Sequence, residues 1–206
     1  RSEARDIFQR LRTARPGLSE AAAEKAGRLL ELEDRLGERL KAFAKIKTAG
    51  GRSRIHGDFH LGQVLVAQND VMFIDFEGEP RRSLTERRAK ASPLRDVAGM
   101  LRSFDYAAAT ALDRHLEHYA ATSEAALART RAWLDHTNRE FLSAYMAGMM
   151  VAPIFPRDEE AARNLIDLFV LQKAMYEIGY ELANRPGWVS IPLDGAITLL
   201  EGDGET

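Results

Sequence analysis

The stretch Ile55-His56-Gly57-Asp58-Phe59-His60-Leu61-Gly62-Gln63 is the most informative part of the sequence for both the fold and the chemistry of the chain. Two β-prone runs follow it, at 64–68 and 71–76, and only Asn69-Asp70 separates them. A two-residue polar link between such runs predicts a β-hairpin. The second run leads into Asp75-Phe76-Glu77-Gly78, so an acidic residue comes at the open end of that hairpin.

The expected register of the hairpin brings two oxygen-bearing side chains together. With Asn69-Asp70 as the turn, Val64 pairs with Asp75, and Gln63 falls opposite Phe76. Cross-strand neighbours lie roughly 5 Å apart, so Gln63 and Asp75 can share one cation. Amide and carboxylate oxygens are ligands that Mg²⁺ prefers, and phosphates and waters would complete its shell. The sequence therefore predicts Gln63 and Asp75 as magnesium ligands.

Asp58 precedes Gln63 by five residues and is the candidate catalytic base. A carboxylate at this spacing can accept the proton of an attacking hydroxyl while a metal-bound phosphate lies beside it, which is what phosphoryl transfer requires. We expect His56 and His60 to support the loop through hydrogen bonds. Gly57 allows the backbone to pack tightly around these groups.

A second interpretation of the same loop is a metal-hydrolase site. His56, Asp58 and His60 stand at i, i+2 and i+4, and alternate residues of an extended segment point the same way. Such a set can bind zinc or iron, although it needs further ligands. The remaining histidines fall in predicted helices and show no matching pattern: His115, His118 and His136.

Helical patterns account for most of the remaining chain. Leucines recur at three- and four-residue spacing within 19–47, which predicts an amphipathic helix that begins after Ser19. Ser92-Pro93 predicts the start of another helix. Two further helices are expected at about 123–150 and 158–184. The apolar positions expected to form one buried face of the helix after Ser92-Pro93 are Leu94, Val97, Ala98, Leu101, Phe104 and Ala108.

The composition excludes several classes of protein. The chain has 206 residues with a formal net charge of -2, and this balance gives no reason to expect a nucleic-acid partner. It has no cysteine, which excludes disulfides and thiolate metal sites and fits a cytoplasmic location. No apolar run approaches the roughly 18 residues of a membrane span, so no membrane partner is expected.

The loop and the acidic motif resemble those of aminoglycoside-phosphotransferase-type kinases, with Gln63 where that superfamily has asparagine. Two later segments, 92–106 and 173–186, are similar to bacterial maltokinases, including those fused to a trehalose synthase. The resemblance implies the transfer of the γ-phosphate of ATP to maltose, with Mg²⁺, in α-glucan and trehalose metabolism. A trehalose synthase is therefore an expected fusion domain or partner.

The resemblance also assigns roles to residues. Asp58 would be the base, Gln63 and Asp75 the magnesium ligands, and Asp96 the anchor of the loop through backbone hydrogen bonds. The alternative for Asp96 is a favourable acidic charge in the first turn of its helix. Glutamine keeps the amide oxygen of asparagine but extends its reach by one methylene.

The candidate sugar-binding residues recur along one predicted helix at i, i+3, i+4, i+7 and i+11, which is one helix face. Hydrogen-bonding groups beside aromatic rings suit a sugar, and the resemblance favours this interpretation. A solvated face with one lysine–glutamate pair is the alternative. We call these residues the α-helical stripe: Lys173, Tyr176, Glu177, Tyr180 and Asn184.

These patterns predict a mainly α fold with a small β-hairpin (α+β), corresponding to the C-terminal lobe of a protein-kinase-like fold. We expect one domain over 1–206, with a helical lead-in at 1–50, the catalytic loop and metal hairpin at 51–80, and a helical substrate-binding subdomain at 92–206. The N-terminal β-rich lobe, with its nucleotide-covering loop and phosphate-pairing lysine, is absent from this sequence. We therefore expect the isolated chain to be inactive.

Two further functions remain to be weighed against a maltose kinase. One is a non-catalytic kinase-like module that scaffolds or regulates a trehalose synthase. The other is phosphorylation of another small acceptor, such as an aminoglycoside or an amino alcohol. Those acceptors are cationic and call for an acidic pocket, whereas the α-helical stripe is mixed in charge and contains a lysine.

Overall fold

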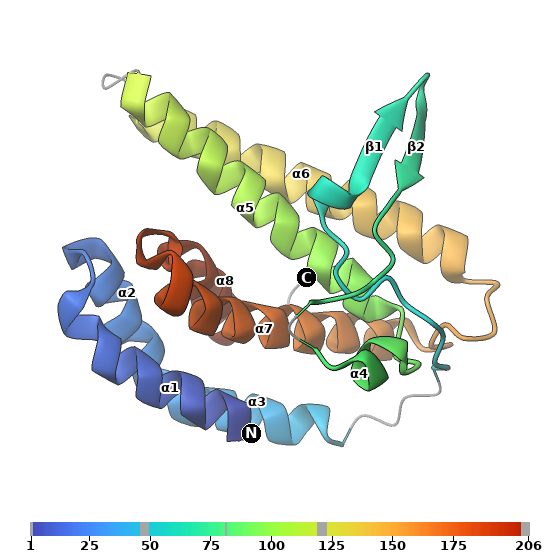
Figure 1. Ribbon diagram of the computed structural model, residues 1–206, viewed down its shortest axis with the longest axis horizontal. Helices are drawn as coiled ribbons and strands as arrows, with labels where there is room; N and C mark the ends of the chain where they lie inside the picture. The colour runs from blue at the N-terminus through green and yellow to red at the C-terminus, as the bar shows by residue number, and fades with distance from the viewer. Residues whose placement is uncertain (1, 46–49, 81, 119–122, 203–206) are drawn as a thin grey trace. The chain divides into compact units, whose positions relative to one another are not determined.

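The computed structural model describes residues 2–45, 50–80, 82–118 and 123–202, which are mostly helical and include one two-stranded hairpin (Figure 1). The predicted mainly α fold with a small hairpin is confirmed. Contacts within the chain group it into two compact units, one made of 1–47 and 163–206 and the other of 48–162. The expected single kinase-like lobe stays a prediction.

The unit formed by 48–162 contains the loop and the hairpin. Its helices α5 and α6 lie side by side, and the ring of Phe104 meets the ring of Phe141 edge-on at 5.5 Å (Figure 1). All six apolar positions predicted for the buried face of α5 are buried. The elements of this unit are η2 (Leu61–Gln63), β1 (Val64–Ala67), β2 (Asp70–Phe73), α4 (Leu84–Arg88), α5 (Leu94–His118) and α6 (Ser123–Met149).

The hairpin exists, but its predicted register is wrong by two residues. Val64 pairs with Phe73, not with Asp75, and Ala67 pairs with Asp70. The turn residues are Gln68 and Asn69, whose φ angles are 50° and 65°. A two-residue hairpin turn of this kind needs left-handed backbone at both positions, and its twist matches that of the flanking strands.

The other unit is built from helices at both ends of the chain. Its apolar core includes Phe8, Leu11, Leu29, Ile178 and Leu193, all of them buried. Its elements are α1 (Ser2–Ala14), η1 (Arg15–Gly17), α2 (Glu20–Glu31), α3 (Glu33–Phe43), η3 (Pro186–Trp188) and α8 (Ser190–Glu201), together with α7 (Glu159–Asn184) from residue 163 onward.

The helix predicted within 19–47 is two helices. Ser19 caps the first, since its side chain accepts a hydrogen bond from the N–H of Ala22. The helical path is interrupted at Leu32, whose ψ is 8°, and α3 then runs to Phe43. The last positions of the predicted span, 46–47, lie outside the described residues. No helix in the described part of the chain is long and apolar enough to cross a membrane.

Candidate active site

The backbone of the predicted catalytic loop, residues 55–63, forms hydrogen bonds with the first turn of α5. The N–H of His56 donates to Asp96 Oδ2 at 2.7 Å, and the N–H of Gly57 donates to Asp96 Oδ1 at 2.9 Å. Gly57 has a φ of 84°, and a Cβ there would lie 3.3 Å from the Cα of Gly78, which is tight packing. Asp96 is therefore bonded to the residues that directly precede Asp58, while its role as a loop anchor in catalysis stays a prediction.

Burial dominates the electrostatics of Asp96. It raises the pKa of this carboxyl, while the two backbone N–H donors from Gly57 and His56 and the imidazole of His56 oppose the rise. Burial also raises the pKa of the Tyr145 hydroxyl, and the negative charge of Asp96 adds to that rise. The carboxylate of Asp96 thus lies in a partly desolvated environment and accepts two backbone hydrogen bonds from the loop.

Both ring nitrogens of His56 form hydrogen bonds with the backbone. Nε2–H donates to the carbonyl of Ile74 at 2.7 Å, and Nδ1 accepts from the N–H of Asp58 at 3.4 Å. Its ring lies 5.4 Å from the ring of Phe59 and 4.9 Å from that of Phe76, which joins the loop to the segment after the hairpin. Within the described residues no three His, Cys, Asp or Glu side chains form a metal-binding group, so the hydrolase interpretation has no support there.

Gln63 and Asp75 are in direct contact. The amide Nε2 of Gln63 donates to Asp75 Oδ2 at 2.9 Å, and the N–H of Ile74 donates to the Gln63 carbonyl at 3.0 Å. The two side chains meet despite the corrected register, because Asp75 has a φ of 61° and leaves the strand direction at once. This left-handed backbone at a non-glycine residue is uncommon and typical of functional turns.

The turn that carries Gln63 has its own support. The ring nitrogen Nδ1 of His60 accepts from the N–H of Gly62 at 3.1 Å and so caps the short helix η2. The N–H of Gln63 donates to the carbonyl of His60 at 2.9 Å. His60 is therefore bonded to the turn that presents Gln63.

The oxygen donors at this end of the hairpin fit magnesium in kind. Asp75 is exposed, and its contact with Gln63 occupies one carboxylate oxygen while the amide oxygen of Gln63 is not the bonded atom. Hard oxygen ligands of this type suit Mg²⁺, which keeps several waters or substrate phosphates in its shell. Their role as ligands stays a prediction.

The α-helical stripe belongs to the unit of 1–47 and 163–206, and all five of its residues lie on α7. They are not equally accessible, since Glu177 is 8% exposed whereas Asn184 lies in the open. Lys173 Nζ lies 5.4 Å from the ring centre of Tyr176, and Asn184 Nδ2 donates to the Tyr180 carbonyl at 2.7 Å. Two pairs of stripe residues are thus in contact with each other, and the role of the stripe in binding a sugar stays a prediction.

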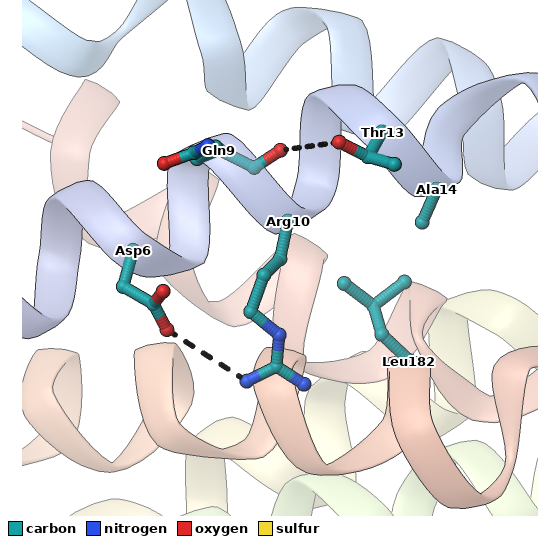
Figure 2. A pocket seen from close by; sticks show the side chains of 6 residues that line it. All are labelled: Asp6, Gln9, Arg10, Thr13, Ala14 and Leu182. Carbon is teal, nitrogen blue, oxygen red and sulfur yellow. Dashed lines mark hydrogen bonds and ion pairs between the residues drawn. The ribbon is translucent and has the colours of Figure 1, made fainter.

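A polar cavity of about 390 Å³ lies in the same unit, on the side of α1 that faces α7 (Figure 2). None of the predicted site residues lines it. The guanidinium of Arg10 donates to the carbonyl of Gly179 at 2.8 Å and lies 3.9 Å from Asp6. This cation therefore joins α1 to α7. Its lining residues are Asp6, Gln9, Arg10, Thr13, Ala14 and Leu182.

Sequence reasoning missed two residues of α5 that touch the catalytic loop. Ser103 Oγ accepts from the N–H of Leu61 at 3.0 Å, and a Cβ at Gly99 would lie 2.6 Å from the carbonyl oxygen of Phe59. The available signal was the glycine itself, because glycine inside an amphipathic helix costs stability and needs a packing reason.

Comparison with known proteins assigns the sequence that carries this site to a family. A family model described as "Phosphotransferase enzyme family" matches residues 2–133, which include the whole loop, the hairpin and α5. The chain belongs to the phosphotransferase enzyme family. The predicted catalytic loop and the Asp75 motif thus lie inside the matched region, and the resemblance to aminoglycoside-phosphotransferase-type kinases is confirmed at the level of the superfamily.

Two curated relatives of this chain are named glucosamine kinase. The one from Streptacidiphilus jiangxiensis is 32% identical over 166 residues, covering 76% of this chain and 36% of the relative. The one from Mycolicibacterium smegmatis is 32% identical over 151 residues, covering 72% of this chain and 34% of the relative. The chain therefore spans about a third of the length of these curated relatives.

The fold of this chain is similar to that of solved kinase structures. A structure described as glucosamine kinase in complex with glucosamine, ADP and inorganic phosphate aligns with a TM-score of 0.68 at 26% identity, covering 96% of this chain and 46% of that one. A second structure of glucosamine kinase, in another crystal form, aligns with a TM-score of 0.67 at 25% identity and covers 45% of that chain. Both alignments take in nearly the whole of the present chain.

Proposed function

We propose that this chain is the C-terminal lobe of an ATP-dependent sugar kinase and that its acceptor is maltose. The observation that carries the proposal is the arrangement of the loop. Asp58 follows two residues whose N–H groups donate to one half-buried carboxylate, and the turn after it brings Gln63 into contact with Asp75. A base, an amide oxygen and a second carboxylate on one short segment are the parts that phosphoryl transfer needs.

In the proposed reaction Asp58 accepts the proton of a sugar hydroxyl as that oxygen attacks the γ-phosphorus of ATP. A new P–O bond forms to the sugar, the bond from the γ-phosphorus to the β–γ bridging oxygen breaks, and ADP leaves. With maltose the product is maltose 1-phosphate. Gln63 and Asp75 would hold Mg²⁺, which supplies neutralising charge to the phosphates when bound.

The acceptor is argued from the charges on α7. An amino sugar such as glucosamine needs a carboxylate for its ammonium group. The buried Glu181 already has a cation, because its two carboxylate oxygens accept from Arg185 at 2.7 and 3.0 Å. Within the stripe the positive charge of Lys173, close to the ring of Tyr176, offsets the negative charge of Glu177. This balance favours a neutral sugar, although the named relatives are glucosamine kinases.

The test is a panel of acceptors offered to the full-length protein with ATP and Mg²⁺, scored by ADP release and by recovery of the sugar phosphate. We expect the highest kcat/KM with maltose, a lower value with glucosamine, and no turnover by residues 1–206 alone. A tenfold preference for glucosamine, roughly 1.4 kcal/mol in transition-state binding, would overturn the maltose assignment.

The non-catalytic alternative predicts a different outcome of the same panel. A module that only scaffolds a trehalose synthase would release no ADP with any sugar. Its removal would instead alter the activity or assembly of the synthase. Turnover by residues 1–206 alone would contradict the proposal that an upstream lobe is needed.

A further inference from the structure

One face of α5 touches the catalytic loop at three successive places. Asp96 accepts from the N–H groups of His56 and Gly57, Gly99 meets the carbonyl of Phe59, and Ser103 accepts from the N–H of Leu61. The helix positions are separated by three and four residues, so they lie on one face. The loop therefore runs along α5 and is in contact with it on both sides of Asp58.

Gly99 leaves no room between the helix and the loop. A Cβ at this position would lie 2.6 Å from the carbonyl oxygen of Phe59, a distance that Cβ atoms do not make with backbone. Glycine inside a helix is destabilising relative to alanine, so its presence here needs a compensating reason. The close approach of Phe59, the residue after Asp58, is that reason.

Ser103 secures the opposite end of the loop. Leu61 opens the short helix η2, whose first N–H groups have no partner within the helix. The hydroxyl of Ser103 accepts from Leu61 at 3.0 Å, and the ring of His60 accepts from Gly62 at 3.1 Å. The turn that ends at Gln63 is thus bonded to α5 as well as to itself.

We propose that Gly99 and Ser103 are positioning residues that set the separation of Asp58 from Gln63. The inference rests on the proposed kinase function, because it assigns the two residues to the distance between the base and the magnesium ligand. Neither residue needs to touch substrate. Their effect is expected in kcat rather than in the KM values, since a loop displaced by about 1 Å can cost 10²-fold in rate.

The chain offers a matched control for Gly99. Gly148 is also a helical glycine, near the end of α6, and a Cβ there would meet nothing within 4 Å. In the full-length protein, Gly99→Ala is expected to lower kcat by about 10²-fold with sugar and ATP KM values nearly unchanged. Gly148→Ala is expected to keep the wild-type kcat. Equal kcat values for the two variants would overturn the proposal.

A second pair of variants tests Ser103 if Gly99→Ala does not fold. Ser103→Ala removes the acceptor of the Leu61 N–H, whereas Ser103→Thr keeps a hydroxyl. We expect about a tenfold loss of kcat in the first and recovery in the second, with faster amide exchange at Leu61 only in the first. Equal amide exchange at Leu61 in both variants would contradict the contact.

The two claims fail in different ways. If the wild-type full-length protein phosphorylates no sugar, the proposed function fails. Amide exchange at Leu61 still reports whether Ser103 holds the loop in that protein. If the wild type is active and both Gly99→Ala and Ser103→Ala retain its kcat, the positioning role fails while the kinase function stands.

Discussion

The catalytic loop and the α-helical stripe are held in place in different ways. The loop is bonded through its backbone, to Asp96 at one end and to Ser103 at the other. The stripe consists of side chains on one face of α7, and Lys173 lies against the ring of Tyr176. A backbone held by a helix keeps its geometry without substrate, whereas a ligand on the stripe competes with existing side-chain contacts.

This difference predicts different kinetic effects in the two regions. Changes beneath the loop alter the geometry of the reacting groups and should act on kcat. Changes on the stripe alter contacts made equally in the ground state and the transition state, so they should act on the KM for sugar. Variants in the loop and variants in the stripe can therefore each test this difference between kcat and KM effects.

The largest effect is expected at Asp96. Asp96→Asn keeps the size of the side chain but replaces one acceptor oxygen by an NH₂ group that faces a backbone N–H. The loop then loses one of its two bonds, and we expect kcat of the full-length protein to fall by about 10²-fold. The control is Asp135→Asn on the exposed face of α6. A kcat equal to that of the control would show that the loop does not depend on Asp96.

The same variant should change how stability depends on pH. Burial raises the pKa of Asp96 in the folded protein, so the folded state binds more protons than the unfolded state between the two pKa values. Stability from this group therefore falls as pH rises from the unfolded value, about 3.9, toward the raised folded value. Urea unfolding at a series of pH values should show this component in the wild type and not in Asp96→Asn.

A smaller effect is expected on the stripe. Glu177 is 8% exposed, and Glu177→Gln keeps its shape while removing its charge and part of its hydrogen-bonding capacity. We expect the KM for maltose to rise about tenfold, roughly 1.4 kcal/mol of binding, with kcat nearly unchanged. Glu160→Gln, in the exposed first turn of α7, is the matched control. A loss in kcat alone would place Glu177 outside the sugar site.

The comparison also explains which features could be predicted from sequence. The buried face of α5 follows hydrophobic periodicity, which is a local property. The hairpin follows from two β-prone runs, but its register depends on which two residues adopt left-handed backbone. Gln68 in that conformation has no clear sequence signal. The predicted register was therefore wrong.

The expected proximity of Gln63 and Asp75 is confirmed in a different register. The Ile74 N–H donates to the Gln63 carbonyl, and the next residue, Asp75, has left-handed backbone and contacts the Gln63 amide. Gly99 and Ser103 could not be assigned from sequence, because they act on a segment some forty residues away in the chain (Ser103 and Leu61 are 42 apart). Contacts of that kind depend on packing between elements and not on local pattern.

The assignment of Asp58 as the catalytic base is tested by Asp58→Asn in the full-length protein. Asparagine keeps the size of the side chain and cannot accept the hydroxyl proton as a carboxylate does. We predict that kcat with maltose falls by about 10²–10⁴-fold, with ADP and sugar phosphate lost in equal proportion and ATP binding retained. Unchanged formation of both products would contradict the assignment of Asp58 as the base and the catalytic role of this lobe.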